Sequence, residues 1–231
     1  MISRVPAGER HSRDFGWLKT FWLFSFDDYV DPNNHSFSSL RVFNDDVVAP
    51  HSGFPLHGHK EMEIVTVMLS GELTHEDSLG NRTAIRAGDI QRMTAGRGMR
   101  HSEFNHSDTP AHFYQLWIEP SERGLSPAFQ EHNFLARPAH GDFEPLVSGL
   151  PELQAPLTIH APVAIYRCAL ASGASVRRSC VGRSIFLYLT AGALVVNGIR
   201  VYAGDQLRIV AEEQLEIEAP VAAVGIMVDL P

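Results

Sequence analysis

The sequence predicts an all-β protein made of two antiparallel β-sandwich or barrel (jelly-roll) domains, and three observations predict it. Short runs rich in Val, Ile, Leu and aromatic residues recur along the 231 residues, and most are bounded by Gly, Pro, Asn or Asp. Turn signals recur between these runs. The order of strands and turns in the first part returns in the last part. Short strands with frequent turns are typical of antiparallel sandwiches and barrels.

Six segments are the clearest predicted strands, because each is short and dominated by aliphatic and aromatic side chains. They are Leu40–Val48, Met62–Leu69, Phe113–Ile118, Val163–Leu170, Ser184–Leu189 and Ala222–Val228. Turns are expected at Ser78–Asn81, Ala87–Asp89, Asn197–Gly198 and Ala203–Asp205.

One short helix and one linker are expected between the two domains. Ser126 offers an N-cap and Pro127 suits the first helical position, so a helix is predicted over Ser126–His132. Four prolines fall between residues 137 and 160, so this segment is predicted to be a linker. The predicted domains are therefore 1–136, which carries the chemistry, and 161–231.

An internal duplication is predicted from two segments that follow one plan. Leu69–Ile90 and Leu189–Leu207 each contain an apolar strand, a glycine turn, a second strand and an Ala-Gly-Asp turn that leads into another strand. The Ala-Gly-Asp turn is common, but here order and spacing agree together.

Composition and charge exclude several classes of protein. The formal net charge is −8, and only two Lys and 17 Arg oppose 27 acids, so direct nucleic-acid binding through a general positive field is not expected. No apolar run approaches the roughly 18 residues of a membrane-spanning helix. The N-terminal residues do not resemble a secretory signal, and Cys168 and Cys180 cannot make a disulfide scaffold. We expect a cytoplasmic monomer without membrane contact, with both cysteines buried and inert.

Histidine is confined to the first part of the chain. All twelve histidines lie between His11 and His160, so imidazole chemistry is expected only in the first domain. Two tripeptides stand out there, His57-Gly58-His59 and His101-Ser102-Glu103. In a strand, side chains at i and i+2 point to the same face, so each tripeptide aims two donor groups the same way. Three imidazoles and one carboxylate suit a divalent transition metal with open coordination positions.

Several other residues near these pairs have two possible roles each. Glu63 shares strand parity with the first histidine pair, so it is either a further ligand or a partner that orients a ligand imidazole, and we prefer the second. His75, His106 and His112 lack paired spacing and are expected to be surface or hydrogen-bonded histidines. Phe43, Phe54 and Met62 are expected either in the core or at an apolar mouth above the metal.

These motifs resemble a known family. The pattern Gly53-x3-His57-x-His59-x3-Glu63-x7-Gly71, followed by Gly88-x5-Thr94-x-Gly96-x4-His101, resembles the two cupin motifs, although its spacings differ and Thr94 stands where proline is usual. The segments Leu40–Asp46, His75–Asn81 and Met93–Glu103 are similar to the pirin family within the cupin superfamily.

The resemblance implies a bicupin, in which the N-terminal barrel holds one divalent metal ion on His57, His59, His101 and Glu103. Fe(II) is the metal expected first, with Mn, Ni, Co, Cu or Zn as alternatives. If Gly71 matches Gly192, the second barrel carries Arg178 and Cys180 near the positions of the first histidine pair. No separate cofactor-binding residues are expected, and the second barrel is expected to be metal-free.

Three functions compete. The resemblance implies a quercetin 2,3-dioxygenase-like oxidoreductase that cleaves a small aromatic flavonol with O2, with Glu103 as both ligand and catalytic proton acceptor. The second hypothesis is a non-enzymatic, metal-dependent regulatory protein that binds a protein partner near Arg97 and Arg100. A sugar-phosphate isomerase is the weakest hypothesis, because only arginines could supply its phosphate clamp.

Overall fold

The computed structural model describes residues 1–134 and 143–231 and divides them into two compact units. The N-terminal barrel comprises the described residues from His11 to Phe134 together with Leu157–Ala161. The C-terminal barrel comprises Met1–Arg10, residues 143–156 and Pro162–Pro231.

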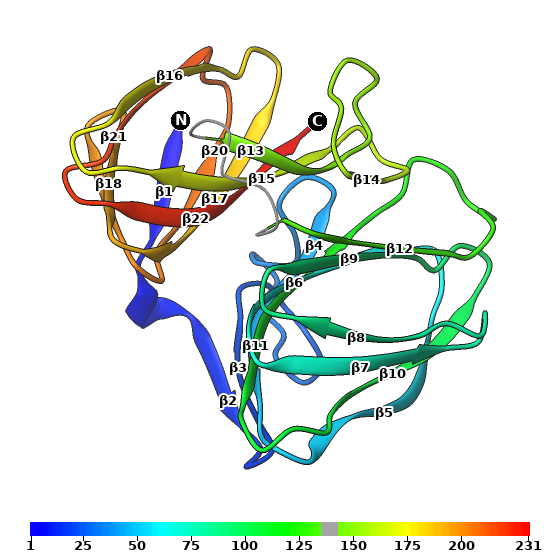
Figure 1. Ribbon diagram of the computed structural model, residues 1–231. Coiled ribbons are helices and arrows are strands. Elements are labelled where there is room, and N and C mark those ends of the chain that lie inside the picture. Colours follow the sequence, from blue (N-terminus) through cyan, green and yellow to red (C-terminus); the bar gives the residue numbers. More distant parts are fainter. Residues whose placement is uncertain (135–142) are drawn as a thin grey trace. The chain divides into compact units, whose positions relative to one another are not determined.

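The N-terminal barrel consists of two antiparallel sheets (Figure 1). The larger sheet has the strand order β12-β9-β6-β11-β4-β3-β2, and the smaller has the order β5-β10-β7-β8. The strands of these sheets are β2 (His11–Asp14), β3 (Leu18–Trp22), β4 (Leu40–Val48), β5 (Ser52–His59), β6 (Glu63–Ser70), β7 (Glu72–Asp77), β8 (Arg82–Arg86), β9 (Asp89–Thr94), β10 (Met99–Asn105), β11 (Ala111–Ile118) and β12 (Ala128–Asn133). The short β14 (Leu157–Thr158) belongs to the same compact unit but to neither of these two sheets.

The C-terminal barrel repeats this plan. One sheet contains β1-β20-β17-β22-β15-β13 in this order, and the other contains β16-β21-β18-β19. The elements are β1 (Ile2–Val5), the 3-10 turn η1 (Ala7–Glu9), β13 (Phe143–Ser148), β15 (Ala164–Leu170), β16 (Ser175–Ser179), β17 (Ser184–Ala191), β18 (Ala193–Val196), β19 (Ile199–Tyr202), β20 (Gln206–Ile209), β21 (Gln214–Glu218) and β22 (Ala223–Leu230). Cys168 and Cys180 are both buried, as expected.

The sheet topology confirms the predicted duplication. The order β5-β10-β7-β8 corresponds strand for strand to β16-β21-β18-β19, and β9-β6-β11-β4 corresponds to β20-β17-β22-β15. Gly71 and Gly192 occupy equivalent turns with φ of 72° and 82°. A Cβ at either glycine would lie within 2.4 Å of a backbone oxygen, of Pro110 or of Ala222. Only glycine combines this φ with such a close backbone approach, so both copies keep it.

All six predicted strands are present, within one or two residues of their expected limits, whereas the predicted helix over Ser126–His132 is wrong. Residues 128–133 instead form β12, which pairs with β9 from Ala128 opposite Thr94 to Asn133 opposite Asp89. The edge of β9 offers a row of backbone partners, and pairing with it outweighs a local N-cap signal. Within the described residues the one helical element is η1, and no helix is long and apolar enough to span a membrane.

The expected domain limits of 1–136, 137–160 and 161–231 differ from these units. Strand β1 pairs with β20, with Ile2 opposite Ile209, so the N-terminal residues complete the C-terminal barrel. Phe143–Ser148, inside the expected linker, pairs with β15 as β13. Local periodicity cannot reveal a pairing between residues about two hundred positions apart. Residues 137–142 of the expected linker lie outside the described residues.

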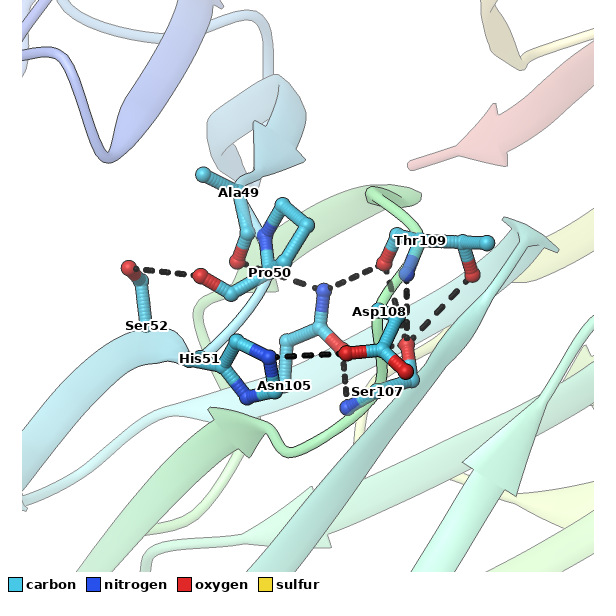
Figure 2. A network of polar contacts seen from close by, with 8 residues as sticks. All are labelled: Ala49, Pro50, His51, Ser52, Asn105, Ser107, Asp108 and Thr109. Atoms are coloured by element: carbon cyan, nitrogen blue, oxygen red, sulfur yellow. Dashed lines mark hydrogen bonds and ion pairs between the residues drawn. The ribbon is translucent and has the colours of Figure 1, made fainter.

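A buried amide fixes the turn that leads out of β10. Asn105 is fully buried, and its Nδ2 donates to the carbonyl oxygens of Val48 (3.3 Å), Ala49 (3.2 Å) and Thr109 (2.8 Å). Its Oδ1 accepts hydrogen bonds from the backbone and hydroxyl of Ser107 (Figure 2). The network joins the end of β4 to the β10–β11 turn, and these strands carry the polar residues of the candidate site.

Candidate metal centre

Two neighbouring strands bring the predicted ligands together. Strands β5 and β10 are antiparallel neighbours, with His57 opposite His101 and a register shift between His101 and Glu103. Along β10, His101 and Glu103 are buried while Arg100 is exposed, and along β5, Gly58 is exposed between two less exposed histidines. The strand alternation predicted from the tripeptides is therefore present.

The three histidines form a compact group of nitrogen donors. His57, His59 and His101 can each offer one ring nitrogen such that all three lie within 4.8 Å of one another. Nε2 of His59 is 3.0 Å from Nε2 of His101. Two nitrogens bound at about 2.1 Å and at a right angle to each other would be about 3.0 Å apart, so this spacing fits a shared metal ion.

Ring orientation also favours metal binding. Nδ1 of His57 is 2.8 Å from the carbonyl oxygen of Pro55, which can only accept, so Nδ1 carries the proton and Nε2 keeps its lone pair. Burial lowers the pKa of His59 to about 4 and that of His101 to about 3, and repulsion between the clustered imidazoles adds to both shifts. Both rings are therefore neutral near pH 7, which is the form that binds a metal.

Glu103 contributes a buried carboxylate with one unused oxygen. Its Oε2 accepts a hydrogen bond of 2.9 Å from the Gln115 amide, and its Oε1 is buried without a hydrogen-bond partner among the residues that the structure describes. The indole N–H of Trp117 donates to Oε1 of Gln115 and thereby fixes which end of this amide faces Glu103. A buried carboxylate oxygen without a partner is costly, and a metal ion or a substrate proton would satisfy it.

His75 is a hydrogen-bonded histidine, which is one of the two roles expected for it, and it also belongs to a second group of donor atoms. It is fully buried, and His75, His101 and Glu103 form a second group whose donor atoms lie within 4.8 Å of one another. The four predicted ligands and His75 thus fall into two overlapping groups of three that share His101. The assignment of His57, His59, His101 and Glu103 as the ligand set stays a prediction. His106 is exposed, and His112 is bonded to Asp45 at 2.7 Å.

Glu63 does not contact an imidazole in the way we expected. It is buried on β6, in the larger sheet, and both of its oxygens lie 3.0 Å from the hydroxyl of Thr94. Burial raises the pKa of Glu63 to about 7, although Arg92 opposes the shift. The parity argument failed because β5 ends at His59, and Glu61, with a φ of 52°, turns the chain before β6 begins.

A cavity of about 630 Å³ opens onto the candidate metal centre. Its volume lies in the range usual for small-molecule sites. Six aromatic side chains line it, and three pairs of them contact each other edge to face at centroid distances of 5.1–5.4 Å. The aromatic lining residues are Phe15, Trp17, Trp22, Phe26, Phe54 and Trp117, with His57, His59, Glu103 and Gln115 on the side of the metal centre. Of the residues expected at an apolar mouth, Phe54 lines this cavity, while Phe43 is buried against Tyr114 and Met62 packs against the Ile64 cluster.

Two polar residues of β4 line the same cavity and were missed by sequence analysis. Oδ1 of Asn44 and Oδ1 of Asp46 are buried and have no hydrogen-bond partner within residues 1–134 and 143–231. Burial raises the pKa of Asp46 to about 7, with repulsion from Asp45 and Glu103 adding to the shift and Thr20 opposing it. The signal was present in the sequence, since two polar residues at i and i+2 interrupt the apolar face of a strand.

In the C-terminal barrel, Arg178 and Cys180 stand near the positions that correspond to His57 and His59. The guanidinium of Arg178 lies over the ring of Tyr166, 4.1 Å from its centroid, and is 3.5 Å from Asp229. Cys180 is buried in the apolar core of this barrel. The absence of a metal from this barrel stays a prediction.

The fold and site together define a class: two cupin-type barrels, of which the N-terminal one carries a histidine cluster that could hold a metal. The family model described as "Pirin" matches residues 6–118, and the model described as "Quercetinase C-terminal cupin domain" matches residues 146–230. The chain belongs to the pirin family.

Similar proteins cover its full length. A protein named quercetin 2,3-dioxygenase from Escherichia coli K12 is 38% identical over 233 residues, covering 100% of this chain and 99% of the relative. A pirin-like protein from Caulobacter vibrioides is 38% identical, covering 99% of both chains. The crystal structure of the bacterial pirin YhhW from Escherichia coli in complex with nickel(II) superposes with a TM-score of 0.94 at 36% identity, covering 100% of this chain and 99% of that one.

Proposed function

We propose that this protein is a metal-dependent dioxygenase that cleaves a flavonol such as quercetin with O2. The observation that carries the proposal is that His57, His59 and the Glu103 carboxylate line a cavity of about 630 Å³ that also has six aromatic lining residues. The His101 ring joins the two histidines in one group of nitrogen donors, and Oε1 of Glu103 has no hydrogen-bond partner among the described residues. The names of the relatives support it, since several are called quercetin 2,3-dioxygenase.

The residues present fit one divalent transition metal, which His57, His59, His101 and Glu103 would hold. Fe(II) is proposed as the native ion, and the nickel(II) complex of the bacterial relative shows that a pirin can accept another metal. When bound, the metal would supply a Lewis-acid and redox centre that joins the substrate and O2 chemistry. Side chains of the protein would bind the substrate and accept its proton.

The cavity wall suits a planar polyphenol. Aromatic rings of the wall can stack on a flavonol and exclude water from it. Buried oxygens of Asn44 and Asp46 lack partners and can accept hydrogen bonds from phenolic hydroxyls. Oε1 of Glu103 would take the proton of the reacting hydroxyl, while Gln115 holds the other oxygen of this carboxylate. Cleavage converts flavonol and O2 into an ester acid and carbon monoxide, so no external reductant is needed.

The test loads the full chain with Fe(II) without air, adds quercetin and O2, and measures flavonol loss and carbon monoxide. We expect turnover by the wild type and by Glu119→Gln, which changes an exposed carboxylate. Glu103→Gln removes the proton acceptor with little change in shape and should lose most of the activity. No turnover by wild type with any of several divalent metals would contradict the proposal.

The alternative is a regulatory pirin whose metal controls the binding of a protein partner. Arg97 and Arg100 are exposed on the segment that precedes and opens β10, where such a partner could bind. The aromatic cavity favours the enzyme, because a partner-binding surface does not need a cavity of this size. A metal-dependent partner in a pull-down, together with absent turnover, would reverse this preference. Cytoplasmic location and the monomeric state stay predictions, to be checked by cell fractionation and by sedimentation.

A further inference from the structure

Two polar side chains of β7, His75 and Asp77, lie beside His101 and are buried from solvent. The antiparallel pairing of β7 with β10 places Asp77 opposite His101 and His75 opposite Glu103. The side chains of His75 and Asp77 are both 0% exposed. Nε2 of His75 is 3.2 Å from Oδ2 of Asp77, and Nδ1 of His75 is 3.5 Å from Nδ1 of His101.

The Asp77 carboxylate can only accept hydrogen bonds. Its Oδ1 accepts from the backbone N–H groups of Leu79 (2.9 Å) and Asn81 (3.1 Å). Its Oδ2 accepts from the side-chain amide of Asn81 at 2.8 Å. Burial alone would raise the pKa of Asp77, but the hydrogen bonds from Asn81 and His75 hold it below its usual value. An ionised carboxylate has no proton to donate, so Nε2 of His75 must be the donor.

This assignment determines the protons of both rings. A neutral imidazole that is protonated on Nε2 is an acceptor on Nδ1. The amide nitrogen of Gln91, 3.4 Å away, can donate to this Nδ1. Nδ1 of His101 can approach the same atom favourably only if it carries its own proton. His101 then has a free lone pair on Nε2, the atom that lies 3.0 Å from Nε2 of His59.

We propose that Asp77 and His75 are positioning residues, which lock His101 in the Nδ1–H tautomer and aim its Nε2 lone pair at the metal position. The inference deepens the proposed function, because it rests on a metal held by His101. We call the hydrogen-bonded series Asp77–His75–His101 the relay. The ring of Phe129 stacks on His75 at a centroid distance of 4.8 Å and an interplanar angle of 26°, which holds the His75 ring in the plane that the relay needs. Hydrogen-bonded partners of this kind raise the basicity of a ligand imidazole as well as orienting it.

The same atoms also allow His75 itself to be a ligand, because His75, His101 and Glu103 form a donor group. The hydrogen bonds argue against this arrangement. One nitrogen of His75 is bonded to Asp77, and the other faces Nδ1 of His101 rather than the Nε2 atoms that converge. Direct ligation by His75 is therefore an outcome that would overturn the proposal.

The test compares Asp77→Asn and His75→Phe with Glu76→Gln. An amide at position 77 can donate to Nε2 of His75, so the relay can reverse and leave the proton of His101 on Nε2. Phenylalanine at position 75 keeps a ring against Phe129 but removes the acceptor. Glu76 lies on the same strand with its side chain half exposed against Arg82, so its amide variant is the matched control.

Two readouts on the full-length chain decide the matter. In the metal-free chain, 15N NMR of labelled histidine should show His101 protonated on Nδ1 in the wild type and in Glu76→Gln, and on Nε2 in Asp77→Asn. Competition with a chelator should show Zn(II), used as a diamagnetic probe, bound about 10- to 100-fold more weakly by both relay variants. Affinity of Glu76→Gln should equal that of the wild type.

Three results would overturn the relay: a wild-type His101 protonated on Nε2, undiminished Zn(II) affinity in both relay variants, or a zinc-shifted 15N signal from His75. Failure of the proposed function looks different. A wild-type chain that binds Zn(II) but never turns over quercetin removes the dioxygenase and leaves the relay intact. The tautomer of His101 is read without any turnover.

Discussion

Asp46 gives a prediction whose size follows from the structure. Its side chain is buried at the cavity, and its pKa is raised from 3.8 to about 7, chiefly because burial withdraws the carboxylate from water. A folded-state pKa above the unfolded value means that the native state loses stability as pH rises between these values. A shift of about 3 units corresponds to ~4 kcal/mol, the upper limit of the cost of ionising Asp46.

Asp46→Asn removes this cost with almost no change in shape. The difference in unfolding free energy, variant minus wild type, should therefore grow by up to ~4 kcal/mol between about pH 4 and pH 8. Urea unfolding of the metal-free chain measures it, because a bound cation near Glu103 would favour the ionised form of Asp46. All three tryptophans, Trp17, Trp22 and Trp117, lie in the N-terminal barrel, so their fluorescence reports this barrel alone.

The control is Glu119→Gln, which replaces an exposed carboxylate and should show no such pH-dependent gain. A difference for Asp46→Asn that stays flat across the pH range, or that shrinks as pH rises, would refute the reasoning.

Three further predictions concern stability and the turns. Asn105→Ala removes the donor to three backbone carbonyls and should lower the unfolding free energy of the N-terminal barrel by about 2–3 kcal/mol in the same urea assay; an unchanged midpoint would contradict the network. Gly71→Ala should lower the melting temperature by several degrees because its Cβ would lie 2.4 Å from the oxygen of Pro110, whereas Gly80→Ala, also at positive φ but with nothing within 4 Å, should lower it much less. Acidification from about pH 6.5 towards 4 should destabilise the metal-free wild type more than it destabilises metal-free His101→Phe, because the depressed pKa of His101 means that the unfolded chain binds more protons in this window, whereas the raised pKa values of Asp46 and Glu63 oppose this loss in both proteins; an equal or smaller loss in the wild type would contradict this account.

Period-two patterns carried most of what the sequence could predict. The aliphatic and aromatic composition of Leu40–Val48 predicted a strand, and the two tripeptides predicted donors on one face of a strand, because these features depend only on neighbouring residues. Pairing partners far apart in the chain could not be predicted in this way. Strand β12 forms because β9 offers an edge, and β1 belongs to the C-terminal barrel because it pairs with β20.

In the candidate site, too, local features could be predicted from the sequence and features that depend on strand pairing could not. Local spacing found the histidine pairs, but the roles of Glu63 and His75 depend on which strands become neighbours. A turn at Glu61 carries Glu63 into the larger sheet, where Thr94 binds it. Pairing of β7 with β10 brings His75 beside His101. Asp46 and Gln115 reach the cavity from β4 and β11, two strands in which the sequence analysis singled out no polar site residue.

The central claim is that His101 and its neighbours hold one divalent metal ion, and metal analysis of purified protein tests it most directly. The wild type and His106→Ala, which changes an exposed histidine, should each bind one ion per chain after loading with Fe(II) and removal of excess metal. His101→Ala removes the residue shared by both donor groups and should retain almost none. Equal metal content in His101→Ala and wild type would contradict the account.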